Sequence, residues 1–146
     1  MLTTQTQNVY LIDTNVISES RKGRRANAGV RGFFERVIAD DIAVFISVVT
    51  IGELRRGIEL IRHRRDEPQA AMLENWLDTV MTEYQDAILA FDAETAQVWG
   101  RLRVPHPENA LDKQIAATAL IYGLTVVTRN ERDIAECGVA VLNPFV

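Results

Sequence analysis

The chain has 146 residues, of which 47% are apolar and 25% charged, a composition typical of a globular domain and unlike disordered or collagen-like chains. Its length indicates that residues 1–146 form a single domain, and its one cysteine, Cys137, excludes an internal disulfide and a zinc site built from several cysteines. The net charge of −4 argues against indiscriminate nucleic-acid binding, although residues 1–65 hold 11 basic and 7 acidic residues.

The sequence lacks targeting and membrane signals. Residues 1–8 have neither the basic start nor the apolar stretch of a signal peptide. No apolar run approaches the ~18 residues that a membrane-spanning helix needs. We therefore expect a cytoplasmic protein that does not enter a membrane.

Apolar runs and helical patterns alternate along the chain. The apolar runs predict strands over 9–12, 42–46, 88–91, 124–127 and 139–142. The helical patterns, capping residues and breaks predict helices from Val16, over 30–40, through Ile51–Ile61, and over 67–84, 93–103, 110–122 and 134–136. This order is typical of a parallel sheet with helices on both faces, so we expect a three-layer α/β domain.

Acidic residues follow the predicted strands. Asp13 ends the first strand, and Glu53 lies just after the second, in the first turn of its helix. Asp112 lies in the first turn of the 110–122 helix, and Asn130 and Asp133 follow the fourth strand. The carboxyl ends of parallel strands share one edge of the sheet, so these side chains should converge there. Carboxylates that repel one another are relieved by a hard divalent cation, and oxygen ligands favour Mg²⁺ or Mn²⁺. Such a site suits metal-assisted hydrolysis of phosphodiesters.

Each acid also has a purely structural interpretation. Thr14 and Asn15 already offer caps for the first helix, which leaves Asp13 free for function. Glu53 could form a capping box with Thr50, and the helix dipole favours Asp112 near a helix start. Asp133 could cap the 134–136 helix. Convergence of the acids, and not any single residue, favours a catalytic site.

Five segments, in this order, resemble those of PIN-domain ribonucleases and, more narrowly, the VapC and FitB toxins of bacterial toxin–antitoxin pairs. The segments are Leu11-Ile12-Asp13-Thr14-Asn15-Val16-Ile17-Ser18-Glu19, Ser47-Val48-Val49-Thr50-Ile51-Gly52-Glu53-Leu54, Leu111-Asp112-Lys113-Gln114-Ile115-Ala116-Ala117-Thr118-Ala119, Leu124-Thr125-Val126-Val127-Thr128-Arg129-Asn130 and Val141-Leu142-Asn143-Pro144-Phe145. The resemblance implies a PIN-like fold over nearly the whole chain.

The resemblance also implies a Mg²⁺-dependent endoribonuclease whose acidic core is Asp13, Glu53 and Asp112, with Asp13 and Asp112 as the main metal ligands. Some relatives have an Asp where this chain has Asn130. Asp133 is therefore the candidate for the fourth catalytic acid, and the number of metal ions stays open.

Members of this family pair with a small antitoxin whose tail blocks the site. They commonly form homodimers, and the toxin–antitoxin complex binds its own promoter DNA. The resemblance therefore implies four partners: an antitoxin, an RNA substrate, promoter DNA through the antitoxin, and a second copy of the chain.

Polar and basic residues near the acids suggest further roles. The hydroxyls of Thr14 and Thr128 are candidates for orienting metal-bound water or phosphate, with backbone capping as the alternative. Four arginines lie nearest in sequence to Asp13 and Glu53 and are candidates for binding RNA phosphates: Arg24, Arg25, Arg55 and Arg56. A solvated surface, or docking of an acidic partner, is the competing interpretation.

Two other functions compete with the nuclease. A signalling receiver would need a pair of acids after its first strand and a lysine after its last, and the chain has neither. A binding module would be a catalytically weak relative that acts with an antitoxin as an operator-binding co-repressor. The intact trio of Asp13, Glu53 and Asp112 argues against that alternative.

Overall fold

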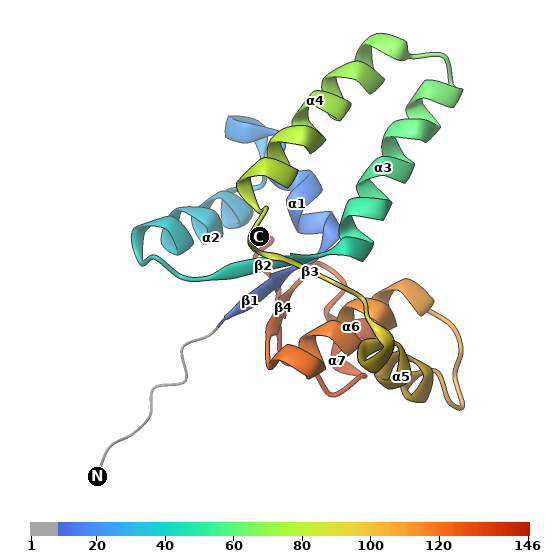
Figure 1. The fold of residues 1–146 in the computed structure, drawn as a ribbon. Coiled ribbons are helices and arrows are strands. Elements are labelled where there is room, and N and C mark those ends of the chain that lie inside the picture. Colours follow the sequence, from blue (N-terminus) through green and yellow to red (C-terminus); the bar gives the residue numbers. More distant parts are fainter. Residues whose placement is uncertain (1–8) are drawn as a thin grey trace.

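In the computed structural model, which describes residues 9–146, helices cover both faces of one parallel sheet (Figure 1). The strands lie in the order β3-β2-β1-β4-β5, and every neighbouring pair is parallel. Their bounds are Tyr10–Ile12 for β1, Val44–Ser47 for β2, Ile88–Leu89 for β3, Thr125–Val127 for β4 and Val141–Leu142 for β5. The predicted parallel α/β architecture is confirmed, while the prediction about residues 1–8 lies outside the described residues.

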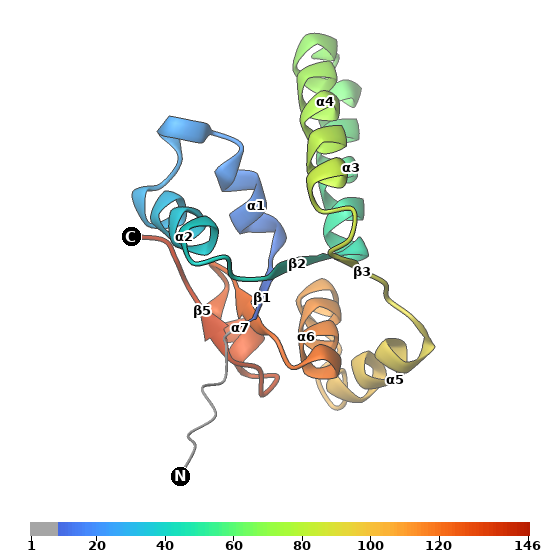
Figure 2. The same ribbon diagram turned by 60° about the vertical axis from the view of Figure 1, so that its left-hand side comes forward.

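Seven α-helices connect these strands in the described part of the chain. They are α1 (Thr14–Ser20), α2 (Ala28–Ala39), α3 (Val48–His63), α4 (Glu67–Glu83), α5 (Ala93–Leu102), α6 (Ala110–Tyr122) and α7 (Glu131–Ala135), with a 3-10 turn at Gly23–Arg25. Helices α3 and α4 form a hairpin that projects beyond the sheet in both views (Figures 1 and 2). Across residues 9–146, none of the helices has the length and apolar character needed to span a bilayer.

Alternation along the strands divides the core into two halves. Ile12 and Val127, paired across β1 and β4, pack with the buried side chains of α1 to α4. Leu11 and Val126, one residue earlier on the same strands, pack with the apolar side chains of α6 and α7. Successive strand residues point to opposite faces, so the sheet forms the middle of three layers.

The first helix begins earlier than predicted. Asp13 is its N-cap, with extended backbone angles (φ −73°, ψ 158°), and its Oδ1 accepts a hydrogen bond from the Thr14 amide at 2.8 Å. The predicted capping by Thr14 and Asn15, with a helix that opens at Val16, is wrong. A carboxylate placed directly after a strand already reaches the amides at the helix start, so α1 follows β1 after a single residue.

The predicted capping box of Thr50 and Glu53 is also wrong. Strand β2 runs directly into α3, and the Ser47 hydroxyl caps the helix by accepting from the Val49 amide at 3.0 Å. Thr50 is buried inside the first turn, where its hydroxyl accepts a 3.2 Å hydrogen bond from the Thr14 hydroxyl. Glu53 therefore lies in the second turn of α3, and its predicted position in the first turn is wrong because the helix begins directly after β2.

Helix α7 begins at Glu131, three residues before the predicted start, and Asn130 occupies its N-cap position. Asp133 consequently lies inside the helix, so its predicted role as a cap is wrong. The helix has only five residues, and boundaries of such short elements are the least certain part of a sequence prediction.

The C-terminal segment packs against the start of α2. The Asn27 side chain accepts a hydrogen bond from the Val146 amide and donates one to the Val146 carbonyl. At Gly29, a Cβ atom would lie 1.9 Å from the Pro144 carbonyl oxygen. Only glycine permits this approach of backbone to backbone.

Candidate active site

A cleft of about 260 Å³ lies at the carboxyl ends of the central strands, between the starts of α1, α3 and α6 and the loop after β4. The residues that line it are Asp13, Thr14, Asn15, Val49, Glu53, Leu111, Asp112, Ile115 and Asn130. Three of these nine are carboxylates and none is Lys, Arg or His. The structure thus brings together the three predicted acids, and we call this cavity the acidic cleft.

Asp13 is the most enclosed of the three acids, with 5% of its surface exposed. One carboxylate oxygen accepts from the Thr14 amide, and the other accepts from the Thr128 hydroxyl at 2.8 Å and the Asn15 amide group at 3.4 Å. Burial raises the pKa of Asp13, although these three hydrogen bonds act in the opposite direction. Because burial disfavours the ionised form of Asp13, a nearby cation would strongly stabilise this carboxylate.

Thr128 and Asn15 connect the loop after β4 to the start of α1. The Thr128 hydroxyl also accepts a hydrogen bond from the Asn130 backbone amide at 2.9 Å. The side-chain oxygen of Asn15, Oδ1, accepts one from the Arg129 backbone amide at 3.1 Å. The network therefore fixes both Asp13 and the loop that carries Asn130. Asn15 was predicted only as a helix cap, because nothing in a single sequence reveals a contact between residues 114 positions apart.

Asp112 lies in the first turn of α6 and is partly exposed. Partial burial raises the pKa of its carboxyl group, and the nearby charges of Asp13 and Asp133 raise it further. A hydrogen bond from the Asn130 side chain acts against these effects. The like charges show that acidic groups from three segments are crowded here.

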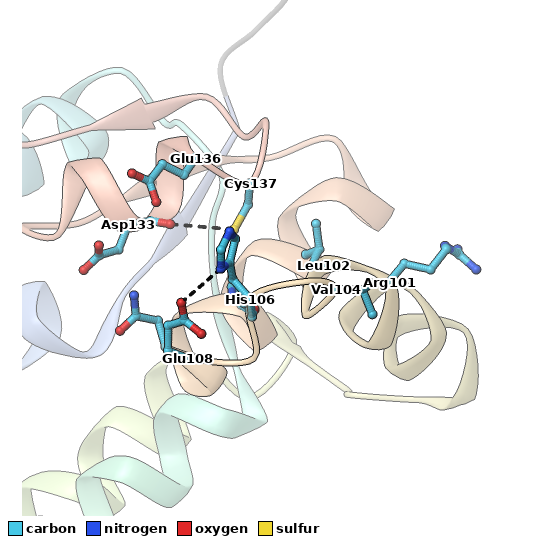
Figure 3. A pocket seen from close by; sticks show the side chains of 10 residues that line it. Arg101, Leu102, Val104, His106, Glu108, Asp133, Glu136 and Cys137 are labelled. Carbon is cyan, nitrogen blue, oxygen red and sulfur yellow. Dashed lines mark hydrogen bonds and ion pairs between the residues drawn. The ribbon is translucent and has the colours of Figure 1, made fainter.

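The two candidates for the fourth position occupy different places. Asn130 lines the acidic cleft, whereas Asp133 lines a larger neighbouring cavity (Figure 3). Asp133 still acts on Asp112 through its charge. Asn130 is thus placed to offer a carbonyl oxygen at the cleft, and Asp133 to offer negative charge from beside it.

The donor set of the acidic cleft fits a hard divalent cation. Within residues 9–146, no three Asp, Glu, His or Cys side chains close on one point tightly enough to enclose an ion by themselves. Mg²⁺ commonly keeps several waters and takes only one or two carboxylates from the protein. Asp13 and Asp112 can supply those two ligands, and no basic side chain of the lining competes with the ion.

None of the four candidate RNA-binding arginines lines the acidic cleft. Arg24 and Arg25 are exposed in the 3-10 turn after α1, and Arg56 is exposed on α3. Arg55 instead contacts Glu74 of α4 at 2.5 Å. It therefore joins the two helices of the projecting hairpin.

A second cleft of about 230 Å³ shares two residues, Thr14 and Glu53, with the acidic cleft. Its walls come from α1, α3 and α4. Five of its eleven lining residues are large and apolar, and these are Leu54, Ile58, Ile61, Leu73 and Trp76. We call it the apolar groove, and it leads to the edge of the acidic cleft.

Residues 10–138 match the sequence pattern of the PIN domain family. The chain belongs to the PIN-domain family. It is 32% identical to Toxin FitB of Neisseria gonorrhoeae, over 94% of this chain and 99% of that protein. It is 26% identical to VapC ribonuclease Y4jK of Sinorhizobium fredii, over 94% and 98%. A solved structure of FitAB bound to an IR36 DNA fragment superimposes with a TM-score of 0.79 at 30% identity, covering 93% of this chain and 95% of that one.

These matches confirm the resemblance to VapC and FitB that the ordered motifs indicated. They also confirm the PIN-like fold, with its central parallel sheet flanked by helices.

Proposed function

We propose that this PIN-domain chain is a Mg²⁺-dependent endoribonuclease and the toxin of a toxin–antitoxin pair. The observation that carries the proposal is the acidic cleft, where Asp13, Glu53 and Asp112 converge without a compensating basic side chain. The likeness to proteins named Toxin FitB and VapC ribonuclease supports the same activity.

In this proposal Asp13 and Asp112 hold the metal ion, and Glu53 supplies the third carboxylate from the facing wall. When bound, Mg²⁺ or Mn²⁺ would lower the pKa of a water molecule and neutralise charge on the scissile phosphate. Thr128 and Asn15 hold the Asp13 carboxylate in one orientation through their hydrogen bonds. Thr14 and Asn130 line the cleft beside the acids and can bind water or a phosphate oxygen.

Water, and not the ribose 2′-hydroxyl, is the nucleophile in this scheme. Purified chain incubated with RNA and Mg²⁺ should therefore leave 5′-phosphate and 3′-hydroxyl ends, and EDTA should stop cleavage. Asp13→Asn should slow cleavage at least ~10²-fold, comparable to losing one electrostatic donor at an active site. Asp78→Asn, an exposed acid on α4, is the matched control.

Cleavage by Asp13→Asn at the wild-type rate would refute this residue assignment. A 2′,3′-cyclic phosphate product would instead show that the ribose attacks, and would refute hydrolysis by water. If the chain cleaves no RNA but its complex with an antitoxin still binds operator DNA, the co-repressor function replaces the nuclease.

The partner we propose is a small antitoxin that occupies the apolar groove. A segment in this groove passes Thr14 and Glu53, so a basic side chain on it can enter the acidic cleft and replace the metal ion. The FitAB structure with DNA supports promoter binding through the antitoxin. We place this interaction in the cytoplasm and expect the toxin to form a homodimer or a higher assembly.

Leu73 and Trp76 on α4 offer a direct test of the groove. Leu73→Asp should weaken copurification with the protein encoded by the neighbouring reading frame, without abolishing RNA cleavage. Met72→Asp, an exposed neighbour outside the groove, is the control. If the wild type, Leu73→Asp and Met72→Asp all copurify equally well with that partner, this docking site is refuted.

For RNA, we propose that Arg24, Arg25 and Arg56 hold phosphates away from the metal, because all three are exposed. Arg55 is the weaker candidate, since contact with RNA would compete with its ion pair to Glu74.

A further inference from the structure

One further cavity beside the acids has no role in the scheme above. It has a volume of about 510 Å³ and lies between the end of α5, the start of α6 and α7. Figure 3 shows His106 and Cys137 in its middle, with Asp133 of α7 and Glu136, the residue after this helix, on one side. Lys113 lines this cavity, while the preceding residue, Asp112, lines the acidic cleft. The two cavities therefore lie on different sides of the first turn of α6.

Lys113 gives the cavity a buried hydrogen-bond donor. Only 9% of this residue is exposed, and its Nζ donates to the His106 carbonyl oxygen. An ammonium group has three N–H donors, so this single contact leaves two that a ligand can use. An acceptor atom of a ligand in this cavity could therefore bind the Lys113 ammonium group, which is already buried in the folded chain.

The charges around Lys113 disfavour a phosphate in this cavity. Three carboxylates line it, those of Glu108, Asp133 and Glu136, and they outnumber its two permanent cations, Arg101 and Lys113. Burial is the main cause that raises the pKa of the Cys137 thiol. Among the nearby charges, Lys113 lowers this pKa, whereas Asp112, Glu136 and Asp133 raise it. A phosphate would face three like charges, whereas a neutral nucleobase would find both a donor and acceptors.

A base edge that carries a carbonyl beside an N–H matches this lining. The carbonyl oxygen can accept from Lys113, and the N–H can donate to a carboxylate, as Asp and Glu do with base N–H groups. Guanine and uracil have such a lactam edge, whereas adenine and cytosine lack it. His106 is exposed and can stack on the base, which is a common way for proteins to hold unpaired bases.

We propose that this cavity is a base-specific subsite that binds a guanine or uracil of single-stranded RNA next to the scissile phosphate, with Lys113 as the specificity-determining residue. The proposal rests on the proposed nuclease function for its biological meaning. Binding of the base itself needs neither metal nor cleavage, so the two can be tested separately.

The experiment is an NMR titration of the full, ¹⁵N-labelled chain in metal-free buffer with the four ribonucleoside 5′-monophosphates. All four share the same phosphate, so differences report on the base. GMP and UMP should shift the amide signals of Lys113 and Cys137 and bind about tenfold more tightly than AMP and CMP. Equal binding of all four, or no shift at these amides, would overturn the proposal.

Lys113→Met keeps the apolar stem and removes the donor, so it should abolish this preference, while the exposed Arg36→Met on α2 should retain it. Preference retained in Lys113→Met would overturn the role of the lysine. If Lys113→Met loses the dispersed spectrum of a folded chain, base analogues on the unmodified chain decide. Inosine monophosphate, which keeps the lactam edge, should bind like GMP, and 2-aminopurine riboside monophosphate should bind like AMP; the reverse ranking would overturn the proposal.

Cleavage of a random RNA pool gives the second readout. Sequenced ends should show G or U enriched at one position beside the cut, and Lys113→Met should lose that enrichment but still cleave. Uniform base usage beside the cut would overturn the subsite. Absence of all cleavage would count against the nuclease alone, since the nucleotide titration still tests the base site.

Discussion

Crowding of the acids predicts that neutralising Asp112 stabilises the metal-free chain. Asp112 is partly buried and feels the charges of Asp13 and Asp133, and all three effects oppose its ionised form. Asp112→Asn removes one charge while keeping the size of the side chain. Asp13 is unsuitable for this test, because Asp13→Asn would also disturb its hydrogen bonds to Thr14 and Thr128.

The magnitude follows from Coulomb repulsion between like charges in a partly solvated cleft. At an effective dielectric constant of about 20, two like charges repel by about 4 kcal/mol at a separation of about 4 Å and by about 2 kcal/mol at about 8 Å. Solvent screening at this partly exposed site reduces the gain to about 1 kcal/mol. For a chain of this size, that corresponds to a rise in Tm of roughly 2–4 °C.

The sign of the pH dependence follows from the direction of the pKa shift. The pKa of Asp112 is raised in the folded chain above its ordinary value of 3.8, so the folded chain binds this proton more tightly than the unfolded chain does. Wild-type stability from this group is therefore present at low pH and is lost as the pH rises through 3.8 and the raised pKa. The gain in stability of Asp112→Asn over the wild type should be full at neutral pH. It should be absent at about pH 3, where residue 112 is uncharged in the wild type as well as in the variant.

Thermal unfolding in EDTA at both pH values, followed by circular dichroism, measures this difference. Asp78→Asn, which removes an exposed charge on α4, should change the free energy of unfolding by less than about 0.5 kcal/mol. Mg²⁺ should then stabilise the wild type more than Asp112→Asn, because the variant has lost a ligand. A lower Tm for metal-free Asp112→Asn at neutral pH, or an equal gain at both pH values, would refute the reasoning.

Three further predictions concern other parts of the molecule. Gly29→Ala should destabilise the fold by about 1–3 kcal/mol, because the new Cβ would clash with the Pro144 carbonyl oxygen. Gly100→Ala, at a helical position with open space around it, should stabilise the fold by about 0.5–1 kcal/mol. Urea unfolding measures both changes. Asn130→Ala should impair RNA cleavage more than Asp133→Ala, since only Asn130 lines the acidic cleft, and initial cleavage rates with the opposite ranking would place the fourth role at Asp133. Arg24→Glu should weaken RNA binding and lower the salt slope by at least the ~0.7 expected for one lost phosphate contact, and an unchanged slope in fluorescence anisotropy would remove Arg24 from the RNA path.

The sequence predicted the sheet and the position of the acids well, for a physical reason. Buried parallel strands need continuous apolar runs, and their ends are marked where polar residues begin. Asp13 directly follows such a run, so its place at the carboxyl edge followed from the strand alone. Asp112 lies in the first turn of a long helix that ends before Gly123, and both ends of this helix were predicted correctly from the sequence.

Helix starts were less predictable because several neighbouring residues can serve as caps. In Asp13-Thr14-Asn15 every side chain can accept from a helix amide, and local preference does not choose among them. Which residue caps the helix depends on the loop after β4. There, the Thr128 hydroxyl donates to Asp13 and the Arg129 amide donates to the Asn15 side chain. Arg55 shows the same limit, since its partner Glu74 lies on another helix.

The hydrogen bonds around Asp13 also explain how one buried residue can cap a helix and bind an ion. Capping uses one carboxylate oxygen, which accepts from the Thr14 amide, while Thr128 and Asn15 hold the other. These donors fix the rotamer and lower the cost of the charge, but burial outweighs them and the pKa stays raised. A carboxylate oxygen has more than one lone pair, so acceptor capacity remains for a cation. The cleft therefore holds an oriented, incompletely compensated charge, and a divalent ion bound there would relieve Asp13 and Asp112 together.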